Sequence, residues 1–420
     1  MTTRSTVTET TPAPAYDGYR AYSYLQAGVD YQDFRLAAEI GRVPAYDGGL
    51  SDEERARVAR LLAENIVISL HEHAVVLPED PDEIRRYNRT GRQRTGYEGL
   101  AHSGLTAVVD NFMAGASCVT SQHGWKWDDM IYALGFRLAD LAKQDFVVHA
   151  TTVQEIRDAK AAGKVALIAG LECATMIENE LDRIDMLYGF GVRQLGIAYS
   201  QANLLGSGLS ERSDAGLTHF GRRAVERMNK LGMAIDISHC GDRTGLDVIE
   251  TSSVPVMITH AGARAVWPIP RLKPDDVIKA CAERGGIIGI EAAPHTTLSE
   301  AHPEHSLESF MDHFQYCVDL VGIDHVTFGP DTMFGDHVAV HRTYAGNYAH
   351  KDENRLQHPL VDYVAGVENP GESFHNITGW LVRHGYSDAD IAKVLGGNTM
   401  RVLEAVWRST DDTDDPARGR

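Results

Sequence analysis

Short apolar runs recur along the chain and alternate with stretches whose apolar residues follow helical spacing. The eight runs are residues 66–73, 104–111, 165–173, 192–200, 233–239, 254–260, 285–293 and 325–331. Amphipathic stretches, such as residues 218–231, 243–251 and 273–284, lie between most of them. Runs that are apolar on both faces are typical of parallel strands buried beneath helices. Eight such strand–helix units favour an α/β fold of the (β/α)8 TIM-like barrel type, and a doubly wound open sheet is the structural alternative.

The nucleotide-binding motifs that would favour an open sheet do not follow the predicted strands. Neither G-x-G-x-x-G nor G-x-x-x-x-G-K-[ST] follows any of the eight runs. A helix is predicted before the first run, because Ser51 to Asn65 combines an acidic first turn with apolar residues at helical spacing. The barrel therefore stays the leading prediction.

Two insertions interrupt the alternation, after the second and the eighth predicted strands. Residues 112–145 form the first, and residues 332–376, rich in His, Tyr and Asn, form the second. A long polar and aromatic loop at the end of a barrel strand is placed to act as a lid, and a plain surface insertion is the alternative. We expect a flexible lead over residues 1–20, one barrel domain over 21–407 and a disordered tail over 408–420.

Composition narrows the class of protein without identifying its chemistry. Among 420 residues, 43% are apolar and 24% are charged, as in ordinary globular proteins. A net charge of -19 argues against a nucleic-acid or anionic-membrane surface. No run approaches about 18 uninterrupted apolar residues, so no membrane span is expected. Five cysteines without a C-x-x-C pair argue against a disulfide framework, and the polar start predicts a cytoplasmic location.

Six residues able to bind metals or transfer protons end the predicted strands. His71 and His73 end the first strand, Glu172 the third, His239 the fifth, His260 the sixth and Asp331 the eighth. Active sites of barrels are built at the C-terminal ends of the strands, so these residues are expected to converge. Alternate residues of a strand point the same way, so both imidazoles of the His-x-His pair can face the barrel mouth.

Their chemistry suits a pair of divalent metal ions. Four neutral imidazoles and one glutamate with two oxygens match two zinc or similar ions, with Glu172 bridging them. Such ions would lower the pKa of a bridging water and polarise a substrate carbonyl, so that metal-bound hydroxide attacks it. Asp331 could accept the water's proton and pass it to the leaving nitrogen. We therefore predict a binuclear zinc hydrolase with a small-molecule substrate.

Sequence blocks around these residues resemble the membrane (renal) dipeptidase family of metallopeptidases, within the metallo-dependent amidohydrolase superfamily. The blocks are GLEC at Glu172, GLTHFGRRAVERMNKLGMAIDISH (216–239), VMITHAGARAVWPIPRLKPDDVI (256–278), HVTFGPD (325–331) and LGGNTMRVLEAV (395–406). The resemblance implies a barrel with two zinc ions, hydrolysis of dipeptides and a homodimeric assembly.

The resemblance also implies roles for individual residues. Glu172 would bridge the metals, while the ligands would include His71, His239 and His260. Asp331 would be the general acid and base. Arg271 would hold a substrate carboxylate, a role that suits its planar, two-toothed guanidinium. The resemblance therefore predicts cleavage of the amide bond of a small, carboxylate-bearing, dipeptide-like substrate.

Two positions depart from the family pattern. His73 stands where the family usually has Asp, and we retain it as a metal ligand because His-x-His is common in the wider superfamily. Tyr199 stands where the dipeptidases have a His that contacts the scissile carbonyl. A tyrosine hydroxyl can still donate a hydrogen bond to a developing oxyanion. Its larger size means that the pocket need not accept ordinary dipeptides.

Other functions remain open alternatives. A specialised amidohydrolase or a metal-dependent decarboxylase would act on a non-peptide metabolite, and a catalytically silent barrel would serve as a binding protein. Histidines outside the strand ends are expected to be polar loop residues, with a role in orienting the metal ligands left open. They are His219, His337, His341 and His350. Three tryptophans, Trp125, Trp127 and Trp267, are expected either to pack or to line the pocket.

Overall fold

The computed structural model describes residues 16–112, 126–344 and 359–407. The predicted tail at 408–420 and most of the predicted lead therefore lie outside the described residues. Of the lead, residues 16–20 are described, and the Tyr19 hydroxyl donates to Asp140 Oδ1 at 2.8 Å. The proposed division into lead, barrel and tail stays a prediction.

All eight predicted strands are present. They are β1 (Ile68–Val76), β3 (Ala107–Asn111), β5 (Val165–Leu171), β6 (Val192–Gly196), β7 (Ala234–Asp236), β8 (Met257–Ala261), β9 (Ile287–Ile290) and β10 (Val326–Phe328). They pair in parallel in the order β10-β9-β8-β7-β6-β5-β3-β1. Every residue in these strands is buried except Arg193 in β6. The apolar runs thus form the parallel sheet that their pattern predicted.

The sheet closes because its last strand is continued by a second short segment. β11 (Met333–Phe334) follows β10 closely in the chain and pairs in parallel with β1. Between them, the Asp331 amide donates to the His71 carbonyl at 3.0 Å, and the His73 amide donates to the Thr332 carbonyl at 2.9 Å. The eighth strand therefore joins β9 to β1, and the predicted TIM-like barrel is confirmed.

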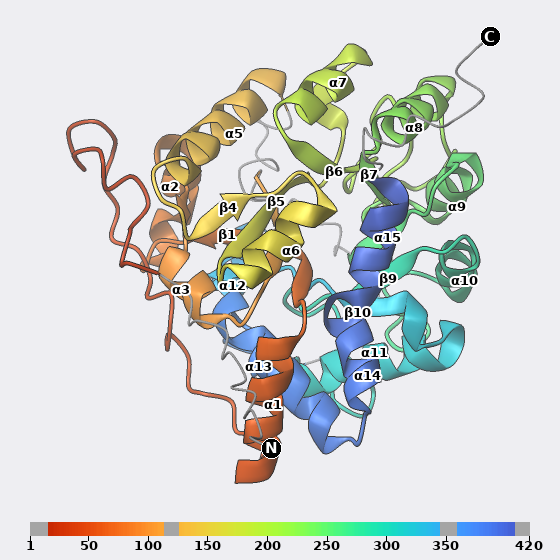
Figure 1. The fold of residues 1–420 in the computed structure, drawn as a ribbon. Coiled ribbons are helices and arrows are strands. Elements are labelled where there is room, and N and C mark those ends of the chain that lie inside the picture. The colour runs from red at the N-terminus through yellow and green to blue at the C-terminus, as the bar shows by residue number, and fades with distance from the viewer. Residues whose placement is uncertain (1–15, 113–125, 345–358, 408–420) are drawn as a thin grey trace, which may run out of the picture.

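Helices surround the strands (Figure 1). They are α1 (Asp52–Glu64), α2 (Ile84–Thr90), α3 (Tyr97–His102), α5 (Trp127–Leu141), α6 (Val153–Ala161), α7 (Asp182–Gly189), α8 (His219–Leu231), α9 (Asp242–Thr251), α10 (Asp275–Glu283), α11 (Leu307–Val321), α12 (His337–Tyr344), α13 (Pro370–Arg383), α14 (Asp388–Ala392) and α15 (Asn398–Val406). Single helical turns lie at Pro81–Glu83, Thr175–Ile177, Ile323–His325 and Lys393–Gly397. The amphipathic stretches became helices where the periodicity predicted them, at α1, α8, α9 and α10.

Local sequence explains why α8 begins and ends where it does. The Thr218 side chain accepts from the Gly221 amide at 2.9 Å and caps the first turn. Gly232 ends the helix with φ 78°, a left-handed conformation that glycine adopts without strain. Between these caps, Ala224, Val225 and Met228 are buried on the face that packs toward the sheet.

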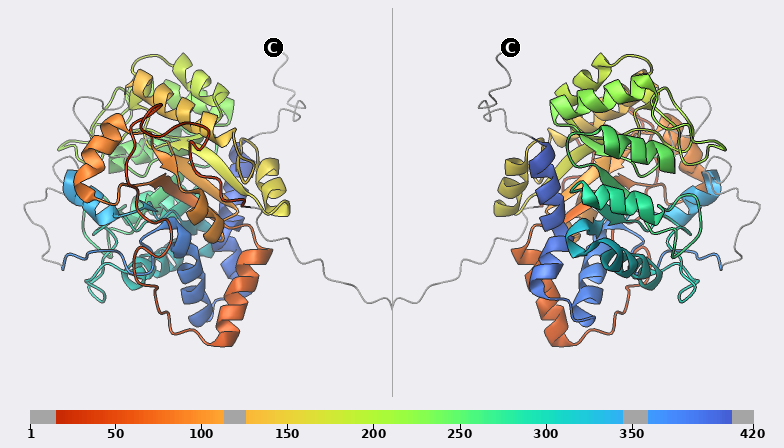
Figure 2. Two further views of the ribbon diagram at one scale, coloured as in Figure 1. Left: turned by 90° about the vertical axis from the view of Figure 1, so that its left-hand side faces the viewer. Right: turned by 90° about the vertical axis from the view of Figure 1, so that its right-hand side faces the viewer.

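Both faces of the strands are buried in apolar clusters. In β5, Leu167 and Ala169 belong to the main core, whereas Ala166 and Ile168 belong to a second cluster that contains Leu403 of α15. At one end of the molecule α1 packs against α13, as both side views show (Figure 2). Packing on two faces explains why the strands are apolar throughout rather than alternating.

The periodicity missed two strands that are too short to give a pattern. β2 (Arg94–Thr95) pairs antiparallel with β1, and β4 (Val147–His149) pairs in parallel with β5. Of the two predicted insertions, the first contains α5, and the second contains β11, α12 and the start of α13. Residues 113–125 and 345–358 lie outside the described residues, and the lid-like role stays a prediction. Among the helices that are described, none has the length and apolar character to cross a membrane.

Candidate metal centre

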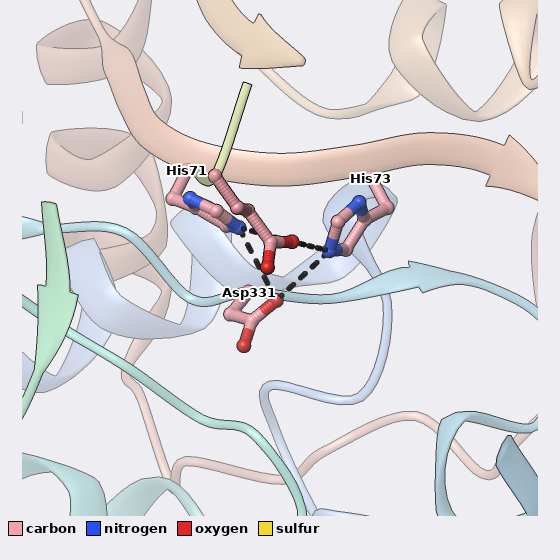
Figure 3. A group of neighbouring side chains, drawn as sticks. His71, His73 and Asp331 are labelled. Carbon is pink, nitrogen blue, oxygen red and sulfur yellow. Dashed lines mark ion pairs between the residues drawn. The ribbon is translucent and has the colours of Figure 1, made fainter. Parts of the chain in front are cut away.

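The barrel brings all six strand-end residues together. His71 and His73 lie within β1, and His260 lies within β8. Glu172 directly follows β5, while His239 and Asp331 each lie three residues beyond a strand. Figure 3 shows the imidazoles of His71 and His73 directed at the Asp331 carboxylate. Closure of the sheet therefore places side chains from five parts of the chain at one site.

One donor group contains His71, His73, Glu172 and Asp331. The His73 Nε2 atom lies 2.8 Å from Glu172 Oε1, and His71 Nε2 lies 3.5 Å from the same oxygen. Asp331 Oδ1 lies 3.4 Å from His71 Nε2 and 3.3 Å from His73 Nε2. One potential ligand atom from each of the four residues lies within 4.8 Å of all the others. The group can therefore surround one metal ion.

A second donor group shares Glu172 with the first. It consists of Glu172, His239 and His260, whose donor atoms also lie within 4.8 Å of one another. His239 Nε2 lies 3.8 Å from Glu172 Oε2 and 3.0 Å from His260 Nε2. Glu172 thus turns Oε1 toward the first group and Oε2 toward the second. This is the geometry that a bridging carboxylate requires.

Electrostatics keep the imidazoles of the second group neutral. Burial holds the pKa of His239 well below its usual value, and the positive charge of Arg271 lowers it further. The pKa of His260 is held well below its usual value by burial, with His71 and Arg271 acting in the same direction. Neutral imidazoles are the form that binds a metal ion.

In the first group, charge pairing outweighs burial. Burial opposes ionisation of Glu172, but His73 and His71 bring its pKa down to about 2. The pKa of Asp331 is likewise held well below its usual value by the two histidines, despite burial. The carboxylates in turn raise the pKa of His71 to about 9. The two carboxylates of this group thus carry negative charge that a bound cation would balance.

Buried polar atoms at the site test whether a cation fits. Glu172 Oε2 and His239 Nδ1 are buried, and no described residue forms a hydrogen bond with either. The Nε2 atoms of His239 and His260 face each other at 3.0 Å, so either a proton or a cation must separate their lone pairs. Buried acceptors without donors are costly, and a metal ion between the two groups would satisfy Glu172 Oε2 and the facing Nε2 atoms. Oxygen and imidazole ligands are those that zinc takes. The residues present fit a pair of divalent cations.

The structure adds side chains that hold the candidate ligands and that the sequence did not reveal. The Asn111 amide nitrogen lies 2.8 Å from His71 Nδ1, and Thr259 Oγ1 lies 2.7 Å from His260 Nδ1. Partners on the second ring nitrogen fix the orientation of a ligating imidazole. Asn111 is the last residue of β3, so the strand-end rule that identified the ligands would have found it as well.

Asp331 has an unusual backbone conformation. Its φ is 57°, in the left-handed region that aspartate tolerates better than most residues. The hydrogen bond from its amide to the His71 carbonyl holds it there. Its side chain is 14% exposed, whereas that of Glu172 is 2% exposed. Asp331 is therefore the carboxylate of the first group that an incoming molecule can reach.

Tyr199 and Arg271 both lie at the site. The Tyr199 ring stacks on His239, with ring centroids 4.0 Å apart. Arg271 is buried and forms an ion pair with Glu291, a residue that no sequence motif indicated. Without the family resemblance, Arg271 would have been taken for a surface residue. The proposed contacts of Tyr199 and Arg271 with substrate stay predictions.

Two insertion histidines lie in a helix, and the expectation of loop positions for them was wrong. His337 and His341 lie in α12, with ring centroids 4.9 Å apart. Burial lowers the pKa of His337 to about 4, and Asp331 is close enough to oppose that shift. A helix forms here because Val338 and Val340 are buried beside His337. The sequence pattern does not show that packing.

The remaining predicted positions lie elsewhere or are not described. His219 begins α8, Trp127 begins α5, and Trp267 is buried with Leu272 and Leu298. His350 and Trp125 lie outside the described residues. None of these residues belongs to the donor groups found in the described chain.

Comparison with known sequences gives a family match. Residues 134–341 match the family described as membrane dipeptidase (peptidase family M19). The dipeptidase tcpJ of Claviceps purpurea (strain 20.1) is 28% identical over 248 residues, which cover 58% of this chain and 52% of that protein. The chain spans 52% to 59% of the length of the three dipeptidases from Claviceps purpurea, Clonostachys rogersoniana and Aspergillus oryzae that it matches.

Solved structures agree with the fold. An amidohydrolase from Pseudomonas aeruginosa is 26% identical with a TM-score of 0.68, and the match covers 83% of this chain and 99% of that one. A metallopeptidase from Rhodobacter sphaeroides, liganded with a phosphinate mimic of the dipeptide L-Ala-D-Ala, is 20% identical with a TM-score of 0.63. That match covers 82% of this chain and 100% of the other. The family match over residues 134–341, the dipeptidase relatives and the shared barrel together make this chain similar to the membrane dipeptidase family.

Proposed function

We propose that this protein is a binuclear zinc-dependent hydrolase that cleaves the amide bond of a small, carboxylate-bearing, dipeptide-like substrate. The observation that carries the proposal is the position of Glu172, whose two carboxylate oxygens face two separate donor groups. The dipeptidase names of the relatives support the reaction class. The dipeptide mimic bound by the metallopeptidase of similar fold supports a substrate of that size.

Each donor group would hold one cation. His71, His73 and Glu172 would hold the first, and Glu172, His239 and His260 the second. Bound zinc ions would supply Lewis acidity and would lower the pKa of water at the site. Burial of the ligands excludes bulk water and strengthens electrostatic interactions with the substrate.

Asp331 would move the proton. Its Oδ1 atom lies within 3.4 Å of both histidines of β1, and its side chain is the most open of the first donor group. A carboxylate in this position can take a proton from the attacking water and deliver it to the leaving nitrogen. Its low pKa keeps it ionised, which is the form that can accept a proton.

Tyr199 would bind the substrate carbonyl. Stacking on His239 fixes the tyrosine ring beside the second donor group. A hydroxyl held in place can donate a hydrogen bond to negative charge that develops on the carbonyl oxygen. This role would replace that of the family's histidine.

Metal analysis and a dipeptide panel test the proposal together. We expect about two zinc ions per chain, and hydrolysis of at least one member of a panel of L,L- and L,D-dipeptides. The variant His219→Ala is a matched control, because His219 is exposed at the start of α8 and should change neither result. Protein that binds no metal would support a silent binding barrel. Two zinc ions without activity across the panel would support an amidohydrolase or decarboxylase of a non-peptide metabolite.

Assembly and location belong to the same proposal. The family resemblance favours a homodimer, and we propose a cytoplasmic location. Sedimentation of the purified protein tests the assembly, because a dimer would have twice the 46.1 kDa mass of one chain. Cell fractionation tests the location.

A further inference from the structure

A row of three aligned residues lies beneath the candidate metal centre. Asn111 of β3, Gly170 of β5 and Gln194 of β6 are neighbours across the three parallel strands. Gly170 lies two residues before Glu172, so the row lies one step below the bridging glutamate on the same face of β5. A side-chain carbon at Gly170 would lie 3.4 Å from Asn111 Oδ1 and 3.6 Å from Gln194 Nε2. The two amides therefore face the same space above Gly170.

The protein chain does not satisfy these two amides. Asn111 is fully buried, and Gln194 is 1% exposed. No described residue forms a hydrogen bond with Asn111 Oδ1, Gln194 Oε1 or Gln194 Nε2. On its other side, Gln194 neighbours Ala234, whose methyl group cannot form a hydrogen bond. Unpaired buried polar atoms are costly, so the space above Gly170 calls for a partner that can bond both amides.

A cation at the first donor group increases this need. The His71 Nε2 atom faces Glu172 and Asp331, so a cation bound there leaves the proton of the ring on Nδ1. The Asn111 amide lies against His71 Nδ1, and it must then present its oxygen to accept a hydrogen bond from that nitrogen. Its own nitrogen is thereby turned toward Gly170, where it is a buried donor that needs an acceptor.

We propose that Gln194 is a positioning residue, which holds the Asn111 amide through a buried water molecule above Gly170 and so orients the His71 imidazole for metal binding. Water both donates and accepts, so it can join the two amides in either orientation. The carbon of an alanine at Gly170 would be fixed 2.9 Å from Val109 Cγ1, whereas a water molecule can move toward the amides. The inference rests on the proposed function, because it requires a cation on His71.

A crystal structure of the zinc-loaded protein tests the water molecule directly. We expect one ordered water within about 3.2 Å of both the Asn111 and the Gln194 amides. The variant Gln194→Met keeps the size of the side chain without its polar atoms, and its crystal structure should lack this water. A direct hydrogen bond between Asn111 and Gln194 in the wild-type protein, or no water between them, would overturn the inference.

Zinc affinity shows whether the bridge supports the metal centre. Gln194→Met should weaken zinc binding about three- to tenfold, the equivalent of one neutral hydrogen bond, as measured by competition with a chromogenic chelator. Gln315→Met is the matched control, because Gln315 hydrogen-bonds Tyr386 and Asp319 and should leave the affinity unchanged. Wild-type affinity in Gln194→Met would contradict the inference.

A double-mutant cycle separates positioning through Asn111 from a role in packing alone. If Gln194 acts through Asn111, adding Gln194→Met to Asn111→Leu should weaken zinc binding no further. If the effects of the two substitutions multiply, Gln194 acts independently of Asn111 and the inference is wrong.

Failure of the inference and failure of the proposed function are distinguishable. A wild-type protein that binds no zinc would contradict the proposed function. Zinc binding by a wild-type protein that has no bridging water would contradict the inference alone. If Gln194→Met fails to fold, the crystal structure of the zinc-loaded wild-type protein decides.

Discussion

At the scale of single residues, Glu172 and Asp331 have similar charges and different surroundings. Glu172 is closed in among His71, His73 and His239, and one of its oxygens lacks a hydrogen-bond partner among the described residues. Asp331 contacts two of these histidines and is more exposed. A carboxylate that is fully enclosed suits a metal bridge, whereas one at the opening suits proton transfer.

The first prediction separates these roles. Asp331→Asn keeps the size of the side chain and removes its capacity to accept a proton. We expect the variant to retain about two zinc ions while kcat falls by roughly 10²- to 10⁴-fold, the usual contribution of a general acid or base. Elemental analysis and steady-state kinetics on one preparation measure both. Unchanged kcat removes Asp331 from proton transfer, and loss of zinc would make it a ligand instead.

The second prediction concerns the support of His71. A half-turn of the Asn111 amide would let its Oδ1, which no described residue hydrogen-bonds, accept from His71 Nδ1–H and leave Nε2 free to bind a cation. Asn111→Leu should therefore weaken zinc binding about 10- to 100-fold. Competition with a chromogenic chelator measures this affinity. Asn376→Leu removes an amide nitrogen that, among the described residues, donates to the Gly366 carbonyl alone, and it should leave the affinity unchanged. Equal affinities in both variants would contradict the proposed support.

At the scale of elements, strand ends carry the site because the strands are held closely together there. Gly196 ends β6, and a Cβ at this position would overlap the backbone carbonyl of Glu172. The close contact lets the end of β5 lie directly against β6. Glu172 is thus positioned by the absence of a side chain on the neighbouring strand.

The third prediction follows from this contact. Gly196→Ala should push the Glu172 backbone away, lower the free energy of unfolding by about 1–3 kcal/mol and weaken zinc binding. Urea unfolding and chelator competition measure the two effects.

Gly135→Ala is its control. A Cβ at Gly135 would meet no heavy atom of the described chain within 4 Å, and the residue lies inside α5. This substitution should stabilise the protein by about 0.5–1 kcal/mol through helix propensity and leave zinc affinity unchanged. Destabilisation by Gly135→Ala, or normal zinc binding by Gly196→Ala, would show that strand contact does not position Glu172.

At the scale of the whole molecule, closure of the barrel concentrates charge in the interior. Carboxylates and imidazoles from β1, β5, β8 and the segments after β7 and β10 share one buried volume. Such a cluster stabilises the fold only when its charges are balanced. Cations bound there would stabilise the native state selectively, because the unfolded chain has no preformed site.

The fourth prediction measures this linkage. Removing metal with a chelator should lower the midpoint of thermal unfolding, since a ligand at 100 times its dissociation constant contributes about 2.7 kcal/mol. Calorimetry of the zinc-loaded and chelated protein gives the difference. Glu172→Gln, which removes the bridging charge, should show a much smaller response to chelator. An identical midpoint in both forms of the wild-type protein would mean that no structural metal is bound.

Local rules determined much of this protein from its sequence alone. Burial on both faces makes each strand apolar, so the eight strands could be predicted from the sequence. Strand ends lie on one rim of a barrel, so His71, His73, Glu172, His239, His260 and Asp331 could be assigned to one site. The family blocks then indicated a resemblance to the membrane dipeptidases, which the later match over residues 134–341 supports.

Only the tertiary structure decided which partners these residues have. Glu291 pairs with Arg271 across 20 positions of sequence, and Asn111 reaches His71 across 40. His337 became buried in a helix, although its neighbours indicated a polar loop. Periodicity reports which face of an element is apolar, because that depends on neighbours a few residues away. Side-chain partners depend on how the strands and loops pack once the barrel has closed, and no local sequence pattern contains that information.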